Sequence, residues 1–226
     1  LAEAQGAATL EDAEYQVSYY AGYFDSAQDA MSTGTLKRTW TFRTDNNGNA
    51  FYTEVSEISD SELYTLSDNT KKALPLGTII FKEVKAPVGY NLDATPHCYK
   101  LTGDSSQNED CQKYKTQEFA DTVIRGDYHL FKEAPIDYKE PKTLIPVSGI
   151  NFEIINENEQ KVVSPDNLAE ISKGKVVTTI TTDSNAIADT KNHTPDNWTA
   201  TLAYGNYRIH EVIPEDIKQN FKEQYG

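Results

Sequence analysis

The chain has 226 residues, of which 35 are acidic and 21 basic, giving a formal net charge of -14 at pH 7. A chain this acidic is a poor partner for nucleic acid or for an anionic membrane surface, because both attract basic proteins. Its length allows one large domain or two of ordinary size. No stretch approaches the ~18 consecutive apolar residues of a membrane-spanning helix.

The N-terminal part of the chain has the signals of β-strands and turns. Residues 13–20, AEYQVSYY, alternate in polarity and then become aromatic, which predicts a strand. Residues 25–34, DSAQDAMSTG, are typical of a loop or a short helix, and residues 37–44 of a second strand. The next letters, DNNG at 45–48, have the residue types of a hairpin turn. They lack the distal glutamate and further acids of an EF-hand, so we expect no calcium site there.

The stretch LGTIIFKEVKAPVGY, residues 76–90, places an acid within an apolar alternating run. Neighbours on a strand point to opposite faces, so Ile79, Phe81 and Glu83 share one face. If Lys82 faces solvent, Glu83 faces the core. A buried carboxylate is costly unless it is hydrogen-bonded or protonated, so we expect this one to have a use. The alternative is an edge strand with a solvated Glu83.

Both cysteines lie in an insertion after this strand, residues 91–115. Cys98 and Cys111 flank a polar, turn-rich run, and in a secreted chain this predicts a disulfide that staples a hairpin and contributes up to ~3 kcal/mol. Gln112 and Gln117 lie close by, which leaves a cysteine–glutamine thioester as an alternative.

The second half of the chain repeats features of the first half in the same order. Each half has a strand with a glycine six residues ahead of a glutamate, Glu83 in the first and Glu211 in the second. The matched pairs are AEYQV with INFEI, WTFRTDNNG with TTITTDSN, and GTIIFKE with GNYRIHE. A repeat of roughly 100 to 130 residues is domain-sized. We therefore predict domains at 1–125 and 126–226, with both glutamates facing the interior.

GTIIFKEVKAPVGY resembles the G-x-Y-x-L-x-E-x-x-A-P-x-G-Y signature of the Cna B-type, or SpaA-like, prealbumin-fold modules of Gram-positive pilins and wall-anchored adhesins, with Ile79 in place of the tyrosine. The second copy keeps Tyr207 and Glu211 but loses the A-P-x-G-Y ending. QGAATLEDAEYQV and FADTVIRGDYHLFK extend the resemblance over most of the chain. It implies an all-β fold of two tandem immunoglobulin-like (Cna B-type) β-sandwich domains, the first with the cysteine hairpin and the second truncated at its C-terminus.

The resemblance also implies a chemistry. In that family a lysine on the first strand attacks an asparagine or aspartate on the last strand, while the glutamate shuttles protons. Carried over, Glu83 and Glu211 are the shuttles, Lys132 is the donor of the second repeat and Asp121 the acceptor of the first. Shared burial favours a neutral amine and a protonated carboxyl group, as the attack requires. The other donor and acceptor would fall outside this sequence, as in a fragment trimmed at both ends. Modules that never form the bond, or a solvated Lys132, are the alternatives.

A structural stalk module at the cell wall, outside the cell, is the function that the resemblance implies, with no enzymatic activity beyond autocatalytic bond formation. Its partners would be other domains of the same surface protein or pilus subunits, and the chain is expected to be a mature fragment. The alternative is an adhesin module that binds a host ligand through residues 91–115. A carbohydrate-active enzyme is disfavoured because Glu83 and Glu211 belong to separate repeats.

No cofactor or metal is expected, because the four histidines show no ligand spacing. Arg125-Gly126-Asp127 spells the tripeptide that integrins bind, but it falls at the expected domain junction. An exposed loop tip would be needed for that recognition.

Overall fold

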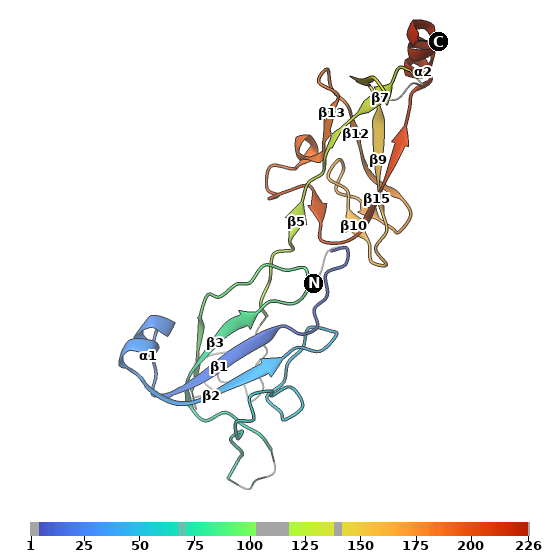
Figure 1. Cartoon of the computed structure of the whole chain (residues 1–226). Coiled ribbons are helices and arrows are strands. Elements are labelled where there is room, and N and C mark those ends of the chain that lie inside the picture. The colour runs from blue at the N-terminus through green and yellow to red at the C-terminus, as the bar shows by residue number, and fades with distance from the viewer. Residues whose placement is uncertain (1–4, 68, 70, 103–117, 138–141, 226) are drawn as a thin grey trace. The chain divides into compact units, whose positions relative to one another are not determined.

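The structure, a computed structural model, describes residues 5–67, 69, 71–102, 118–137 and 142–225 (Figure 1). This part of the chain is mostly β-strand in several antiparallel sheets, in agreement with the expected all-β class. Tertiary contacts divide the chain into two compact units. The first unit is Thr9–Thr122, and the second is Val123–Gly226 together with the residues before Thr9. Among the described helices, none has the length and hydropathy to cross a membrane.

The first unit is built on an antiparallel sheet with the strand order β2-β1-β3-β4. Its strands are β1 (Glu14–Ala21), β2 (Thr35–Arg43), β3 (Gly77–Lys85) and β4 (His97–Leu101). A short helix, α1 (Ala27–Thr33), joins β1 to β2 and begins at Ser26, whose hydroxyl oxygen accepts the backbone N–H of Asp29 at 3.1 Å. Such N-terminal caps stabilise short helices.

Both faces of this sheet are covered by apolar side chains. One face carries the buried cluster of Val17, Tyr19, Trp40, Phe42, Leu63 and Ile79. The other face packs Tyr20 and Ile80 against Ala30 of α1. Burial on both faces explains why the alternation in β1 gives way to consecutive aromatic residues at its end.

The second unit contains a three-stranded antiparallel sheet, β12-β9-β15, and several short strand pairs. Its elements are β5 (Arg125–Gly126), β6 (His129–Phe131), β7 (Glu133–Pro135), β8 (Leu144–Pro146), β9 (Asn151–Asn156), β10 (Val162–Val163), β11 (Glu170–Ile171), β12 (Val176–Thr181), β13 (Ile187–Asp189), the short 3-10 helix η2 (Thr190–His193), β14 (Leu202–Ala203), β15 (Tyr207–Val212) and α2 (Glu215–Tyr225). The strands β5, β6 and β7 follow one another and pair with β14, β13 and β8 respectively.

The core of the second unit lies between these elements. Its buried side chains are Val147, Ile150, Phe152, Ile154, Val162, Val177, Ile180, Ala188 and Leu202. Ile217 and Phe221 of α2 pack against this cluster with one face of the helix. The helix α2, which was not predicted from the sequence, has no fully buried residue of its own.

Strand register in the two units follows the sequence repeat. Tyr15 on β1 lies opposite Glu83 on β3, and Phe152 on β9 lies opposite Glu211 on β15. On the other side, β1 pairs with β2 and β9 pairs with β12, both antiparallel. The sequence match of AEYQV with INFEI therefore corresponds to equivalent strand positions.

A buried threonine repeats the same hydrogen bonds in each unit. The hydroxyl of Thr44 accepts the backbone N–H of Ala13 at 3.0 Å and donates to the carbonyl of Leu10 at 2.7 Å. The hydroxyl of Thr182 accepts from Ile150 at 2.9 Å and donates to Val147 at 3.0 Å. These bonds tie the end of β2 or β12 to the segment that precedes the neighbouring strand, β1 or β9.

Candidate functional site

Strand β3 carries Glu83 into the interior of the first unit. The side chain is 3% exposed, whereas its neighbour Lys82 is exposed, so the prediction that Glu83 faces the core is confirmed. The alternative of a solvated glutamate on an edge strand is wrong, because β3 lies between β1 and β4. A carboxyl group at this depth needs partners that offset the loss of hydration.

The residues around Glu83 supply only some of the hydrogen bonds that a buried carboxyl group needs. Its Oε2 accepts the backbone N–H of Asp93 at 2.8 Å. Its Oε1 is buried and has no hydrogen-bond partner in the described part of the chain. Burial raises the pKa of the Glu83 carboxyl group, and the nearby carboxylates of Asp121 and Asp93 raise it further, against the lowering effects of the Asp93 N–H and the Tyr15 hydroxyl. This environment favours a protonated Glu83.

Asp121, the predicted acceptor, lies in the same acid cluster. Burial raises the pKa of its carboxyl group, and the negative charge of Asp93 adds to the effect. Burial also raises the pKa of the Tyr15 hydroxyl, with further contributions from Asp121 and Glu83. The predicted acceptor Asp121 is therefore close enough to the predicted shuttle Glu83 to raise the pKa of its carboxyl group.

Aromatic rings pack together next to Glu83 and its strand partner Tyr15. The ring of Phe119 stacks on Tyr15 with the centroids 5.2 Å apart and lies 5.8 Å from Phe81 and 5.1 Å from His97. Because low polarity strengthens charge interactions, the burial of Glu83 makes its protonation sensitive to neighbouring charges. Tyr15, Asp93 and Phe119 were missed in the sequence analysis. Only Tyr15 had a signal, its position opposite the glutamate in the repeat.

In the second unit the predicted donor and shuttle are in direct contact. The Nζ atom of Lys132 lies 3.0 Å from both carboxylate oxygens of Glu211. Lys132 follows β6, and its backbone is held on both sides: its N–H donates to Ala186 at 2.9 Å, and its carbonyl accepts from Val147 at 3.0 Å. This contact joins residues 79 positions apart in sequence.

Glu211 is less buried than we expected from the repeat. The side chain of Glu211 is 33% exposed and that of Lys132 is 25% exposed. The surroundings of the two strands differ: β15 is an edge strand among the described strands, whereas β3 has β4 beside Gly77–Phe81 and the Asp93 backbone hydrogen-bonded to Glu83. The expectation that both glutamates face the interior thus holds fully only for Glu83.

Of the two cysteines, the structure describes only Cys98. It lies on β4, is half-buried, and its thiol is 3.8 Å from the carbonyl oxygen of Phe24. Burial raises the pKa of this thiol. Cys111, Gln112 and Gln117 lie outside the described residues, as does much of the 91–115 insertion, so the disulfide stays a prediction.

The integrin-type tripeptide is not at a loop tip. Arg125 and Gly126 form β5, and the guanidinium of Arg125 lies 3.5 Å from the centre of the Trp198 ring. Asp127 accepts hydrogen bonds from the Thr190 hydroxyl at 2.9 Å and the Thr201 N–H at 3.1 Å. Because these side chains already make contacts within the second unit, the structure argues against integrin recognition of this tripeptide.

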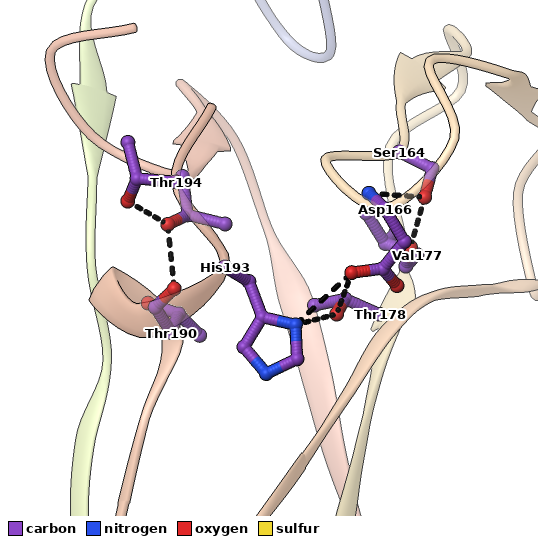
Figure 2. Close-up of polar contacts among 8 residues, drawn as sticks. Ser164, Asp166, Val177, Thr178, Thr190, His193 and Thr194 are labelled. Carbon is purple, nitrogen blue, oxygen red and sulfur yellow. Dashed lines mark hydrogen bonds and ion pairs between the residues drawn. The ribbon is translucent and has the colours of Figure 1, made fainter. Parts of the chain in front are cut away.

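A second polar cluster in the second unit surrounds His193 (Figure 2). The Nδ1 atom of His193 lies 3.0 Å from a carboxylate oxygen of Asp166 and 3.4 Å from the Thr178 hydroxyl. Ser164 donates to the carbonyl of Val177 at 2.7 Å beside it. The cluster connects η2 to β12 and to the loop after β10. No group of three or more metal-ligating side chains gathers within the described residues.

No family model matches the chain, and no curated protein matches it. Among solved structures the chain is similar to the Bacillus anthracis TIE protein, with 19% sequence identity and a TM-score of 0.45. The match covers 95% of this chain and 27% of that one, so the chain spans about a quarter of the length of that structure.

Proposed function

We propose that the chain is part of the stalk, or backbone, of a Gram-positive pilin or cell-surface adhesin, located outside the cell at the wall. In this proposal the two compact units are tandem immunoglobulin-like Cna B-type sandwiches. The observation that carries it is the contact between Lys132 and Glu211, with Nζ 3.0 Å from both carboxylate oxygens. A buried Glu83 beside Asp121, at the equivalent place in the other unit, supports the same interpretation.

The chemistry proposed for these sites is the formation of an amide between two side chains. The lysine nitrogen attacks the side-chain carbonyl carbon of an asparagine or aspartate, a C–N bond forms, and the bond to the leaving nitrogen or oxygen breaks. Glu211 accepts the proton that the attacking nitrogen loses and passes it to the departing ammonia or water. Fixed side chains in a folded core supply much of the rate, because the reacting groups are held together before the reaction.

In the first unit the proposal assigns the acceptor role to Asp121. A protonated Glu83 can donate a hydrogen bond to the Asp121 carbonyl oxygen and polarise it for attack. The raised pKa of Glu83, caused first by burial, supports this role because it favours the protonated form of the carboxyl group. The chain acts on no other molecule in this scheme, so it is not an enzyme in the usual sense.

The mechanical role follows from where such a bond would lie. A covalent cross-link between the first and last strands of a sandwich carries a pulling force itself. The hydrogen bonds between the strands therefore do not bear that force. A disulfide between Cys98 and Cys111 would add a second staple in the first unit. Neighbouring domains of the same surface protein, or pilus subunits, are the proposed partners.

Intact mass spectrometry tests the proposal on a chain that carries further residues on both sides of this sequence. After reduction of disulfides, each bond lowers the mass by ~17 Da when ammonia leaves or ~18 Da when water leaves. The matched control is Lys132→Arg, which keeps the positive charge but provides no nucleophilic amine. The measured mass of this variant should show one bond-related deficit fewer than that of the unmodified chain. An unchanged mass in the unmodified chain would reject the cross-link.

A further inference from the structure

The order of the chain makes the first unit an insertion in the second unit. Residues 5–8 belong to the second unit, although the first unit, Thr9–Thr122, follows them directly. The chain returns to the second unit at Val123, so it crosses between the two units twice. A domain tolerates such an insertion when the ends of the inserted part lie close together.

Residues 5–8, which we call the strap, are bonded to the second unit by their backbone. The N–H of Gly6 donates to the carbonyl of Lys161 at 3.0 Å. The N–H of Ala7 donates to the carbonyl of Tyr204 at 3.0 Å. The strap also forms an isolated antiparallel bridge with β10. These bonds show that the strap occupies a defined place rather than lying loosely on the surface.

Gly6 is buried at a place that has no room for a side chain. A Cβ atom there would lie 2.5 Å from the Tyr204 carbonyl oxygen and 3.3 Å from a methyl group of Val162. The side chain of Asn158 lines the same place, and its Nδ2 donates to Oδ1 of Asn156 at 2.8 Å. Both asparagines are buried, so their hydrogen bonds fix this wall. A glycine, here with a φ of 68°, is therefore the residue that fits.

In the second unit the backbone of Tyr204 contacts both chain connections. Its carbonyl accepts the N–H of Ala7 from the strap, and its N–H donates to the carbonyl of Ile124 at 2.8 Å. Ile124 comes directly after Val123, where the chain returns from the first unit. The incoming segment and the returning segment are therefore both hydrogen-bonded to one residue.

In the first unit one turn contacts both ends of the inserted chain. The N–H of Thr9, where the first unit begins, donates to the carbonyl of Val88 at 3.0 Å. The carbonyl of Thr122, where it ends, accepts the backbone N–H of Asn91 at 2.8 Å. Val88 and Asn91 lie three residues apart in the turn that follows β3. The two ends of the first unit are therefore held next to each other, as an insertion requires.

We propose that the strap acts as a non-covalent cross-link around the first unit, so that residues outside the first unit stabilise it. The physical reason is the entropy of the unfolded chain. If the first unit unfolds while the strap is docked, residues 9–122 form a loop with two fixed ends, which has fewer conformations than a chain with one free end. Release of the strap should therefore lower the stability of the first unit, as opening a cross-link does. This coupling depends neither on the proposed stalk function nor on an amide bond between side chains.

Hydrogen exchange, measured by NMR on the full 226-residue chain, tests whether the strap is docked. The amide protons of Gly6 and Ala7 should exchange at least ~100-fold more slowly than in an unstructured peptide, because both are bonded to the second unit. Exchange at the rate of an unstructured peptide would overturn the proposal.

Gly6→Ala and its control Gly174→Ala separate release of the strap from a general loss of stability. Both replace a glycine of positive φ in the second unit, 68° and 75°, so the backbone strain is matched. A Cβ at position 6 meets the Tyr204 carbonyl oxygen, whereas a Cβ at position 174 has nothing within 4 Å. Gly6→Ala should speed exchange at Ala7 at least ~10-fold, and Gly174→Ala should leave it unchanged.

The stability of the first unit then tests the coupling itself. In a Trp198→Phe background, the fluorescence of the buried Trp40 follows urea unfolding of the first unit. Gly6→Ala should lower the midpoint by about 0.5 M urea or more, although it lies outside this unit. Gly174→Ala should leave the midpoint unchanged, and a chain without residues 1–8 should show the Gly6→Ala shift. An unchanged midpoint in Gly6→Ala, or the same shift in both glycine variants, would overturn the proposal.

Discussion

The buried carboxyl group of Glu83 should destabilise the first unit at neutral and alkaline pH, and Glu83→Gln should remove that cost. Glu83 has a raised pKa in the folded state because of burial, so the folded state binds more protons than the unfolded state. Its stabilising contribution is thus fully present below the unfolded pKa and is lost as the pH rises through the folded pKa.

The size of the effect follows from the charge on the buried carboxylate. Each pKa unit by which burial raises the pKa of a carboxyl group corresponds to about 1.4 kcal/mol, and the glutamine variant occupies the same buried site without a charge. We expect Glu83→Gln to be more stable than the unmodified chain by about 1–3 kcal/mol at pH 8, since the amide carries no charge into the core. At pH 4 both side chains are neutral and the difference should nearly vanish.

Urea denaturation followed by tryptophan fluorescence measures this difference. Trp40 is fully buried in the first unit, and the chain has only one other tryptophan, so a Trp198→Phe background makes the signal specific. The unmodified chain keeps some pH dependence from Asp121, whose pKa is also raised by burial. The same stability gap at pH 4 and pH 8, or a variant that is less stable at pH 8, would refute the reasoning.

Three further substitutions in the second unit have defined expectations. Thr182→Val leaves a buried N–H and a buried carbonyl without hydrogen-bond partners. It should lower the free energy of unfolding, measured by urea denaturation, by about 2–4 kcal/mol. A loss below ~0.5 kcal/mol would contradict the role of the repeated threonine. Arg125→Ala removes the cation–π contact with Trp198 and should cost about 1 kcal/mol, with a shift in the Trp198 emission maximum; unchanged emission would count against the contact. Lys132→Met breaks a half-exposed pair with Glu211 and should cost at most ~1 kcal/mol in the same assay, so a larger loss would mean that this pair is structural.

The position of the glutamates on their strands was predictable from the sequence. Alternation in LGTIIFKEVK sets which side chains share a face, since the strand period of two is local backbone geometry. The repeat identified equivalent positions because the same turn and strand signals recur in order. The match of AEYQV with INFEI agrees with the observed register opposite Glu83 and Glu211.

Tertiary structure alone decided how each glutamate is surrounded. The contact of Lys132 with Glu211 crosses 79 residues, and the stacking of Phe119 on Tyr15 joins segments from opposite ends of the first unit. Burial depth also differs between the two glutamates, since the Asp93 segment lies against Glu83 while β15 is an edge strand among the described strands. Periodicity reports which way a side chain points. What covers it depends on residues distant in sequence, so the pKa and the exposure of these carboxyl groups could not be read from local patterns.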